Sequence, residues 1–372
     1  MTEWKKLGDF SMLQKTRNRK HITENAYSIT QAGLIPTKSF FKDKTNITSK
    51  DTSGYYIVEK DWFVYSPSRI DVGSISYLKD EGPVIVSPID VVFSIDKTVC
   101  LPSYLLNYFF TYKGRKDLLK NREGVEGTGR RSLPFSAIEN MPIPIPSLPE
   151  QERIVKALDT FTCSIENLKE QITQRRKQYE YYRDRLIDLD GKEGVELKEV
   201  ACLVKDRINA IELTLQNYTS VENLLKDKAG RKDADNVPLV GNWVKYQAGD
   251  VLLGNIRPYL RKIWLSDRNG GTNGDVIVVR PNIEVMPTFL YYVLSSEHFF
   301  VYYNQTAKGG KMPRGDKNTI LQYKCILPSF SEQQRIVSIL DTFEASIRNL
   351  EQQLALRKKQ YDYYRNQLLT FE

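Results

Sequence analysis

The sequence predicts an α+β chain in which two β-rich globular segments alternate with two long helices. Residues 150–187 recur as residues 332–369 in a gapless register, and the apolar spacing within both copies is helical. Elsewhere, short β-branched and aromatic runs are separated by Gly, Pro, Ser and Asp, as in strands joined by tight turns. We therefore expect a globular segment at 1–147, a helix at 148–190, a second globular segment at 191–329 and a second helix at 330–372.

The first globular segment is predicted to be mostly strand. Residues 55–58, 62–65 and 84–86 are β-rich runs. A helix with a broad apolar face is expected after Pro102. The proline-rich run 141–146 is incompatible with a helix or a central strand, so it should be an extended lead into the first long helix.

Each long helix begins with Ser-x-x-Glu, the spacing of a capping box, at Ser147 and Ser329. Apolar and aromatic residues then alternate at steps of three and four, the pattern of a coiled-coil seam. In the first copy these are Leu158, Phe161, Ile165, Leu168, Ile172, Tyr179, Tyr182 and Leu186, and in the second Leu340, Phe343, Ile347, Leu350, Leu354, Tyr361, Tyr364 and Leu368. Arg175 and Arg357 interrupt the seam and are interpreted as polar breaks that set its register. A helix of about 40 residues is on the order of 60 Å long, so a seam of this length requires a partner helix.

The second globular segment repeats the plan of the first with a different sequence. Residues 249–254 and 275–279 are predicted strands, residues 287–294 a helix, and residues 309–314 a basic glycine loop that corresponds to 127–131 in the first half. Because the helices kept their residues while the globular segments diverged, we expect the two globular segments to perform related but different tasks.

Composition excludes several classes of function. No apolar run reaches the roughly 20 residues of a membrane span, and the N-terminal stretch resembles no targeting signal, so a cytoplasmic location is expected. The net charge of +8 is concentrated outside the helices and favours polyanion binding. No Pro-Pro, Walker loop or Gly-x-Gly-x-x-Gly is present, and the two histidines lie in different halves, so neither catalysis nor a metal site is expected.

The layout resembles the specificity subunit of type I restriction-modification enzymes. The resemblance rests on the Glu-Gln openings at Glu150 and Glu332, the tyrosine-rich ends of both helices, and the stretch Gly-Asp-Val-Leu-Leu-Gly-Asn-Ile-Arg-Pro-Tyr-Leu at 249–260. It implies two target-recognition domains that each read one half of a bipartite, asymmetric DNA site, with the helices packed antiparallel as a spacer in a pseudo-twofold arrangement. It also implies two modification subunits that carry S-adenosylmethionine, and restriction subunits, as partners. This chain itself should be non-catalytic and bind no cofactor. The first domain lacks an obvious Asn-Ile-Arg-Pro-Tyr-Leu counterpart.

Basic residues in irregular segments are the candidates for DNA contact, because their side chains reach a groove or a phosphate. Ordinary solvated surface is the alternative for each, although the two glycine loops are favoured because they recur with basic residues in both halves. The candidates in the first segment are Arg17, Arg19, Lys20, Lys42, Lys44, Arg69, Arg115, Arg130 and Arg131, and in the second Lys228, Arg231, Lys232, Arg257, Arg261, Lys311 and Arg314. Arg257 and Tyr259 have a second interpretation, in which they only shape the strand ends.

Tyr181 and Tyr363 fall outside the seam in both copies, which predicts a second covered surface on the helices. The resemblance identifies the modification subunit as the partner at that surface. Two alternatives from other classes are a non-enzymatic coiled-coil scaffold with two protein-binding domains, and a self-sufficient nuclease or methyltransferase without recognisable motifs. Salt-dependent DNA binding separates the scaffold from the specificity subunit, and a methylation assay of the chain alone tests for the enzyme.

Overall fold

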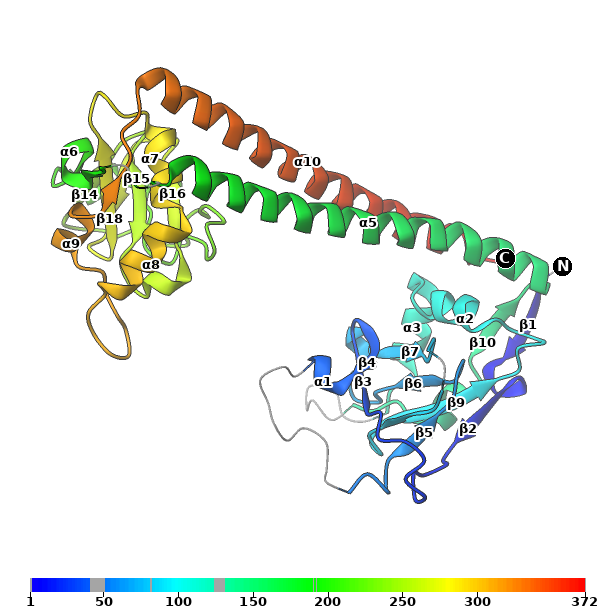
Figure 1. Cartoon of the computed structure of the whole chain (residues 1–372). Helices are drawn as coiled ribbons and strands as arrows, with labels where there is room; N and C mark the ends of the chain where they lie inside the picture. Colours follow the sequence, from blue (N-terminus) through cyan, green and yellow to red (C-terminus); the bar gives the residue numbers. More distant parts are fainter. Residues whose placement is uncertain are drawn as a thin grey trace. The chain divides into compact units, whose positions relative to one another are not determined.

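The computed structural model describes residues 2–40, 51–80, 82–123, 131–189, 191 and 193–371. The chain forms two compact units, the first comprising 1–168 with 353–372 and the second 169–352. The predicted long helices are present as α5 (Leu148–Ile187) and α10 (Phe330–Leu368). Each unit therefore contains one globular part and one end of each long helix, and Figure 1 shows these elements along the chain.

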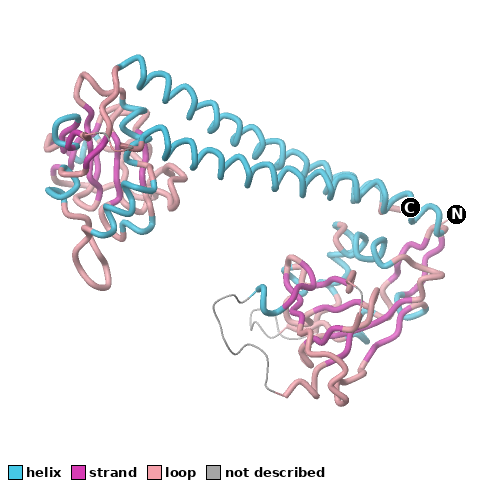
Figure 2. Tube along the Cα trace, in the orientation of Figure 1, coloured by secondary structure: helices cyan, strands magenta, loops and turns pink. Residues whose placement is uncertain are grey.

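The globular part of the first unit is built on an antiparallel sheet in the order β2-β9-β6-β7. Two short pairs, β3 with β4 and β5 with β8, complete its strands, and Figure 2 shows how strand and loop dominate this part. The strands are β2 (Ser11–Gln14), β3 (Tyr27–Thr30), β4 (Gly33–Pro36), β5 (Tyr56–Val58), β6 (Phe63–Tyr65), β7 (Ile75–Tyr77), β8 (Val84–Val86) and β9 (Val91–Ile95). The short helices are η1 (Leu7–Asp9), α1 (Thr37–Phe40), η2 (Ile70–Val72), α2 (Pro102–Phe109), α3 (Tyr112–Lys120) and α4 (Phe135–Ile138).

The core of this unit lies between the sheet and α2, the helix predicted after Pro102. Phe63 and Phe93 stack with their centroids 4.9 Å apart, and Phe109 meets Phe63 edge-on. Ile154 and Leu158 of α5 join the same buried cluster. The start of the long helix is therefore part of the hydrophobic core of this unit, which fixes its direction of departure.

The second unit has a corresponding antiparallel sheet in the order β12-β18-β15-β16, and α7 packs on three of its strands. A second sheet has the order β13-β14-β17. The strands are β12 (Ala201–Leu203), β13 (Arg207–Asn209), β14 (Asn242–Tyr246), β15 (Val251–Gly254), β16 (Ile263–Leu265), β17 (Gly270–Thr272) and β18 (Val276–Pro281). The short helices are α6 (Leu197–Val200), η3 (Ala210–Glu212), η4 (Pro258–Leu260), α7 (Pro287–Leu294), α8 (Glu297–Gln305) and α9 (Lys317–Leu321).

In both units, a short two-stranded antiparallel pair precedes the long helix that begins there. The proline-rich run before α5 forms the strand β10 (Pro142–Ile145), which pairs only with β1 (Glu3–Lys6). Proline has no amide proton to donate, so this two-stranded edge is the position that such a sequence tolerates. In the second unit β11 (Val195–Glu196) pairs with β19 (Lys324–Cys325) ahead of α10.

Within each unit, the two long helices run antiparallel and contact each other through aromatic stacks. In the first unit Phe161 stacks on Tyr364 at 5.3 Å, and the Arg357 guanidinium lies 5.8 Å from the Phe161 centroid. In the second unit Phe343 stacks on Tyr182 at 5.5 Å, and Arg175 lies 5.8 Å from the Phe343 centroid. The polar breaks predicted in the seam are thus stacked on the aromatic ring of the facing helix.

The buried face shifts by one residue at the C-terminal end of each long helix. Tyr182 and Tyr364 keep their cross-helix stacks but are 44% and 45% exposed, whereas Arg183, one residue further, is 2% exposed. The Arg183 guanidinium contacts the Tyr179 ring and pairs with Asp184 at 2.9 Å. The shift occurs because this end of the helix packs against a globular part as well as against its partner helix.

A buried glutamine attaches the start of each long helix to the globular part. The Gln151 side chain accepts from Leu101 N and donates to the carbonyls of Val99 and Pro146, all at 2.9 Å. These bonds hold the segment that leads into α2. Burial of three satisfied hydrogen bonds explains why glutamine follows glutamate at the opening of the helix.

Gln333 repeats this clamp in the second unit. It accepts from Met286 N at 2.9 Å and donates to the carbonyls of Glu284 and Pro328 at 2.9 and 3.1 Å. The segment that it holds leads into α7, the counterpart of α2. One residue type at one helical position thus performs the same task twice.

The end of each long helix is attached at the first residue of a short helix. Asn366 Oδ1 accepts from Tyr112 N, the first residue of α3, at 2.7 Å. Asp184 Oδ1 accepts from Glu297 N, the first residue of α8, at 3.4 Å. An oxygen acceptor here satisfies an amide that a helix leaves unpaired at its N-terminus. Each globular part is therefore held by the start of one long helix and the end of the other.

Candidate nucleic-acid interface

Two predicted motifs of the second segment come together in the structure. The Asn255–Leu260 turn and the 308–314 loop are joined by an antiparallel bridge between Ile256 and Arg314, and Arg257 N donates to Pro313 O at 2.8 Å. Lys308 and Arg314 also exchange backbone hydrogen bonds that close the loop. In Figure 1 this loop projects from the unit between α8 and α9. Both motifs were predicted from the sequence as candidates for DNA contact, but their contact with each other was not predicted.

A buried tyrosine supports the junction of these two motifs. The Tyr303 hydroxyl contacts Gly254 O at 3.3 Å and Asn255 Oδ1 at 3.0 Å, and Gly315 N donates to Asn255 O at 3.2 Å. Arg257 and Arg261 have positive φ angles of 54° and 49° on either side of η4. Non-glycine residues adopt this conformation at a cost, and such backbone strain is concentrated at functional sites.

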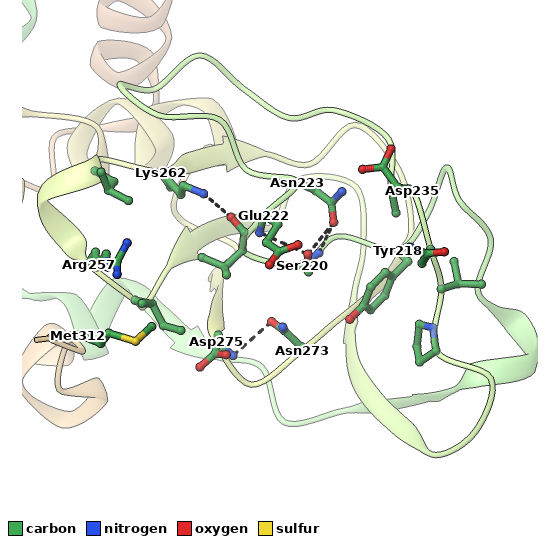
Figure 3. A pocket seen from close by; sticks show the side chains of 17 residues that line it. Tyr218, Ser220, Glu222, Asn223, Asp235, Arg257, Lys262, Asn273, Asp275 and Met312 are labelled. Carbon is green, nitrogen blue, oxygen red and sulfur yellow. Dashed lines mark hydrogen bonds between the residues drawn. The ribbon is translucent and has the colours of Figure 1, made fainter. Parts of the chain in front are cut away.

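A cleft of about 670 Å³ opens beside this junction (Figure 3). Its lining includes the acidic and amide residues Glu222, Asn223, Asp235, Asn236, Asn273 and Asp275, the basic residues Arg257 and Lys262, and Met312 of the projecting loop. Arg314 pairs with Asp275 at 3.2 Å. Within the described part of the chain, the exposed Arg257 side chain has no hydrogen-bond or ion-pair partner, and neither does Lys311.

The other basic candidates of this unit are engaged with the protein itself. Arg261 pairs with Glu297 at 2.6 Å, and Lys228 lies 5.9 Å from the Phe300 centroid. Burial, with Arg183 and Arg261 nearby, lowers the pKa of Lys228 to about 8. Lys228 and Arg261 thus lie where the end of α5 meets α8, and their backbones are bonded to each other at 2.9 Å.

Arg231 and Lys232 lie on the long loop that precedes β14. The Arg231 guanidinium is largely buried over the Trp264 ring, pairs with Asp233 at 2.7 Å and donates to Gln216 O at 2.9 Å. Lys232 is exposed and pairs with Asp235 at 3.0 Å. In the structure Arg231 therefore stabilises the loop, whereas Lys232 pairs with a residue that lines the cleft.

In the first unit, a basic cluster surrounds η2. Arg115 donates to Asp71 O, Arg122 pairs with the Asp71 carboxylate at 3.5 Å, and Arg122 also donates to Arg131 O at 3.1 Å. Arg69 is the residue immediately before the same short helix, and its side chain makes no capping hydrogen bond. The structure thus gathers three predicted candidates, Arg69, Arg115 and Arg131. Arg122 was missed, although its position shortly before the basic glycine loop was a signal.

A second basic loop of this unit carries Arg17, Arg19 and Lys20. The buried Asn18 holds the loop, because its side chain accepts from Ile22 N and donates to Thr23 O at 2.8 and 2.9 Å. The three cations flank Asn18 and are exposed. Lys42, Lys44 and Arg130 lie outside the described residues, as does most of the 127–131 loop.

The helix tyrosines predicted to face a partner are exposed. Tyr181 and Tyr363 are 57% and 60% exposed, and each meets the neighbouring seam tyrosine edge-on at 5.3 Å. The partner subunit at this surface stays a prediction. Among the described residues, no helix has the length and apolarity to cross a membrane, and no three His, Cys, Asp or Glu side chains form a group suited to a metal ion.

The fold places the chain in the class of α+β proteins with two β-rich globular parts and two long helices. The model of the type I restriction modification DNA specificity domain matches residues 1–175 and 244–356, more than half of the chain. The chain therefore belongs to the family of type I restriction-modification specificity subunits, as the sequence analysis indicated. These are the recognition subunits and not the catalytic subunits of their systems.

Several relatives and solved structures are similar to this chain. A type I restriction enzyme specificity subunit of Escherichia coli is 28% identical over 269 residues, and the match spans 63% of each chain. A putative specificity subunit of Haemophilus influenzae is 30% identical over 66% of this chain and 68% of its own length. A chain from a study of complex assembly and conformational transition in the type I system has a TM-score of 0.63 at 16% identity, covering 99% and 97% of the two chains. The S subunit of Mycoplasma genitalium gives a TM-score of 0.54 at 14% identity over 100% and 97%.

Proposed function

We propose that this chain reads a bipartite, asymmetric DNA sequence with its two globular parts and directs modification and restriction subunits to that sequence. The paired long helices act as a ruler that sets the number of unread base pairs between the two half-sites. The chain performs neither methyl transfer nor cleavage. It binds no cofactor, and S-adenosylmethionine is carried by each of two modification subunits in a cytoplasmic complex.

One contrast supports this proposal most directly. The two globular parts are attached to the long helices in the same way, but their basic surfaces differ. Gln151 and Gln333 clamp their units with matching hydrogen bonds, so the two units are attached by one design. The basic surfaces that the units offer are different. The first unit has an arginine cluster around Asp71, whereas the second has the strained turn, its loop and the cleft. Because the two globular parts are attached alike but present different basic surfaces, we expect them to read two unlike half-sites at a fixed spacing.

Partner binding is proposed for the outer face of the long helices. Tyr181 and Tyr363 occupy corresponding positions, so one kind of partner surface fits both, which agrees with two modification subunits. An exposed aromatic is a frequent anchor at protein interfaces.

The test is to express the chain with its modification subunits and to map methylated positions across a genome. A single interrupted, non-palindromic motif is the expected result. Exchanging residues 191–329 for the corresponding segment of another family member should replace one half of the motif and leave the other. Methylation by the purified chain alone, or DNA binding without any sequence preference, would contradict the proposal.

A further inference from the structure

The cleft of the second unit has two walls of opposite chemical character. One wall comes from the irregular segment 218–238 and carries Glu222, Asp235 and Asn236. The other comes from residues 256–262 and the projecting loop and carries Arg257, Lys262 and Met312. Figure 3 shows Glu222 between the two walls, with Arg257 and Met312 on one side and Asp235 and Tyr218 on the other.

Glu222 is held through its backbone, and its carboxylate interacts with Lys262 of the other wall only at long range. Glu222 N donates to Ser220 Oγ at 3.3 Å, and Ser220 Oγ is fixed by Asn223 Oδ1 at 2.8 Å. Asn223 is itself buried and donates to Asp233 O at 3.3 Å. Within the described residues the exposed Glu222 carboxylate has neither a hydrogen bond nor an ion pair. The other two cleft carboxylates are paired, Asp235 with Lys232 and Asp275 with Arg314.

A free carboxylate restricts what the first wall can face in a DNA complex. It repels phosphate, whereas it accepts hydrogen bonds from amino groups. On the edges of base pairs in the major groove, the strong donors are adenine N6 and cytosine N4, and Glu and Asp are the side chains that accept from cytosine N4. Arg257 on the opposite wall and Lys311 of the projecting loop have the charge that phosphate requires.

We propose that the two walls divide the task of recognition, and that Glu222 is a specificity-determining residue of the second unit. Glu222 accepts a hydrogen bond from an exocyclic amino group of a base in the half-site, while Arg257 and Lys311 neutralise backbone phosphates. This assignment rests on the proposed DNA-reading function and names the residues and base chemistry for one half of it.

The test uses the full chain with its modification subunits and three variants, Glu222→Gln, Arg257→Gln and Glu284→Gln. Glu284 is the matched control, because it is exposed in the same unit and does not line the cleft. Binding to duplexes of the mapped site and its single-base variants is measured at several salt concentrations, together with thermal unfolding. Glu222→Asp is included because it keeps the charge and shortens the reach by one methylene.

Glu222→Gln should reduce discrimination at one base pair of the second half-site by about 5- to 150-fold, with the first half-site unchanged. Glu222→Asp should change discrimination at the same base pair. Arg257→Gln should weaken binding to all sequences alike and lower the salt slope by about 0.9, and Glu284→Gln should match the wild type. Unchanged discrimination in Glu222→Gln, or a uniform change for all sequences, overturns the assignment. A wild-type chain without sequence preference overturns the proposed function instead, and the assignment with it.

Discussion

At the scale of single residues, two pairs of positions retained in both halves have exacting hydrogen-bond or stacking partners. Gln151 and Gln333 each satisfy one amide and two carbonyls. Arg175 and Arg357 each lie over an aromatic ring of the facing helix. A buried polar side chain is tolerated when all of its partners are present, which restricts the two buried glutamines most strongly.

Gln151→Leu should lower the free energy of unfolding by about 2 to 4 kcal/mol, because it leaves one amide and two carbonyls without their partner. Leucine has nearly the volume of glutamine, so the loss reports the hydrogen bonds and not a cavity. Urea unfolding of the full chain measures the change. Gln178→Leu, on the exposed face of the same helix, is the control and should be within about 0.5 kcal/mol of the wild type. Equal stability of the two variants would refute the clamp.

Asp90 should make the first unit less stable as pH rises. Burial raises the pKa of Asp90 from 3.8 to about 7, so between pH 4 and 7 the folded chain holds a proton that the unfolded chain has lost. Stability therefore falls through this window and is lowest above pH 7. Asp90→Asn should remove the trend and add up to about 4 kcal/mol at pH 8, with little change at pH 4. Urea midpoints across this range measure it, with the exposed Asp159→Asn as control. A parallel pH profile for wild type and Asp90→Asn would contradict it.

At the scale of elements, the sequence predicted the helices and strands that have a periodic or β-rich pattern of residues. The repeat located α5 and α10, and β-rich runs located β5, β6, β8, β15 and β18. Contacts between distant segments carry no such signal. The shift of the buried face to Arg183 depends on the docking of α5 against α8, and the arginine cluster at Asp71 depends on the packing of α3 against η2. The contact between the 255–260 turn and the 308–314 loop could not be predicted for the same reason.

The junction of that turn and loop depends on a glycine. A Cβ at Gly315 would overlap the Tyr303 ring, whereas a Cβ at Gly310 would meet nothing within 4 Å. Gly315→Ala should therefore displace Tyr303 from Asn255, cost about 1 to 3 kcal/mol of stability and weaken recognition by the second unit. Gly310→Ala in the same loop is the matched control and should leave thermal unfolding unchanged. Equal melting temperatures for the two variants would show that the junction is not tightly packed.

At the scale of the whole molecule, the aromatic stacks between the long helices and the arginines that lie over them have counterparts in the other half. The Arg176–Glu351 ion pair does not, because the corresponding residues are Lys358 and Lys169. The first unit uses Tyr364, Arg357 and Asn366 of α10, and the corresponding residues of α5 are Tyr182, Arg175 and Asp184. Asp184 offers the same oxygen acceptor to a helix N-terminus as Asn366 does. These three contacts that α10 makes in the first unit can therefore be made by α5 as well.

A fragment that ends near Asp190 should consequently form a twofold dimer, in which α5 of a second copy replaces α10. An unpaired apolar seam is unfavourable in water, and an isologous interface requires only a self-complementary surface. Sedimentation should show a dimer, and Ile165→Glu in the buried seam should abolish it, whereas Thr173→Glu on the exposed face should not. With modification subunits, this dimer presents the first recognition surface twice in inverted orientation, so it should methylate an interrupted palindrome built from the first half-site. A stable folded monomer, or methylation that still requires the second half-site, would refute the equivalence of the two helices.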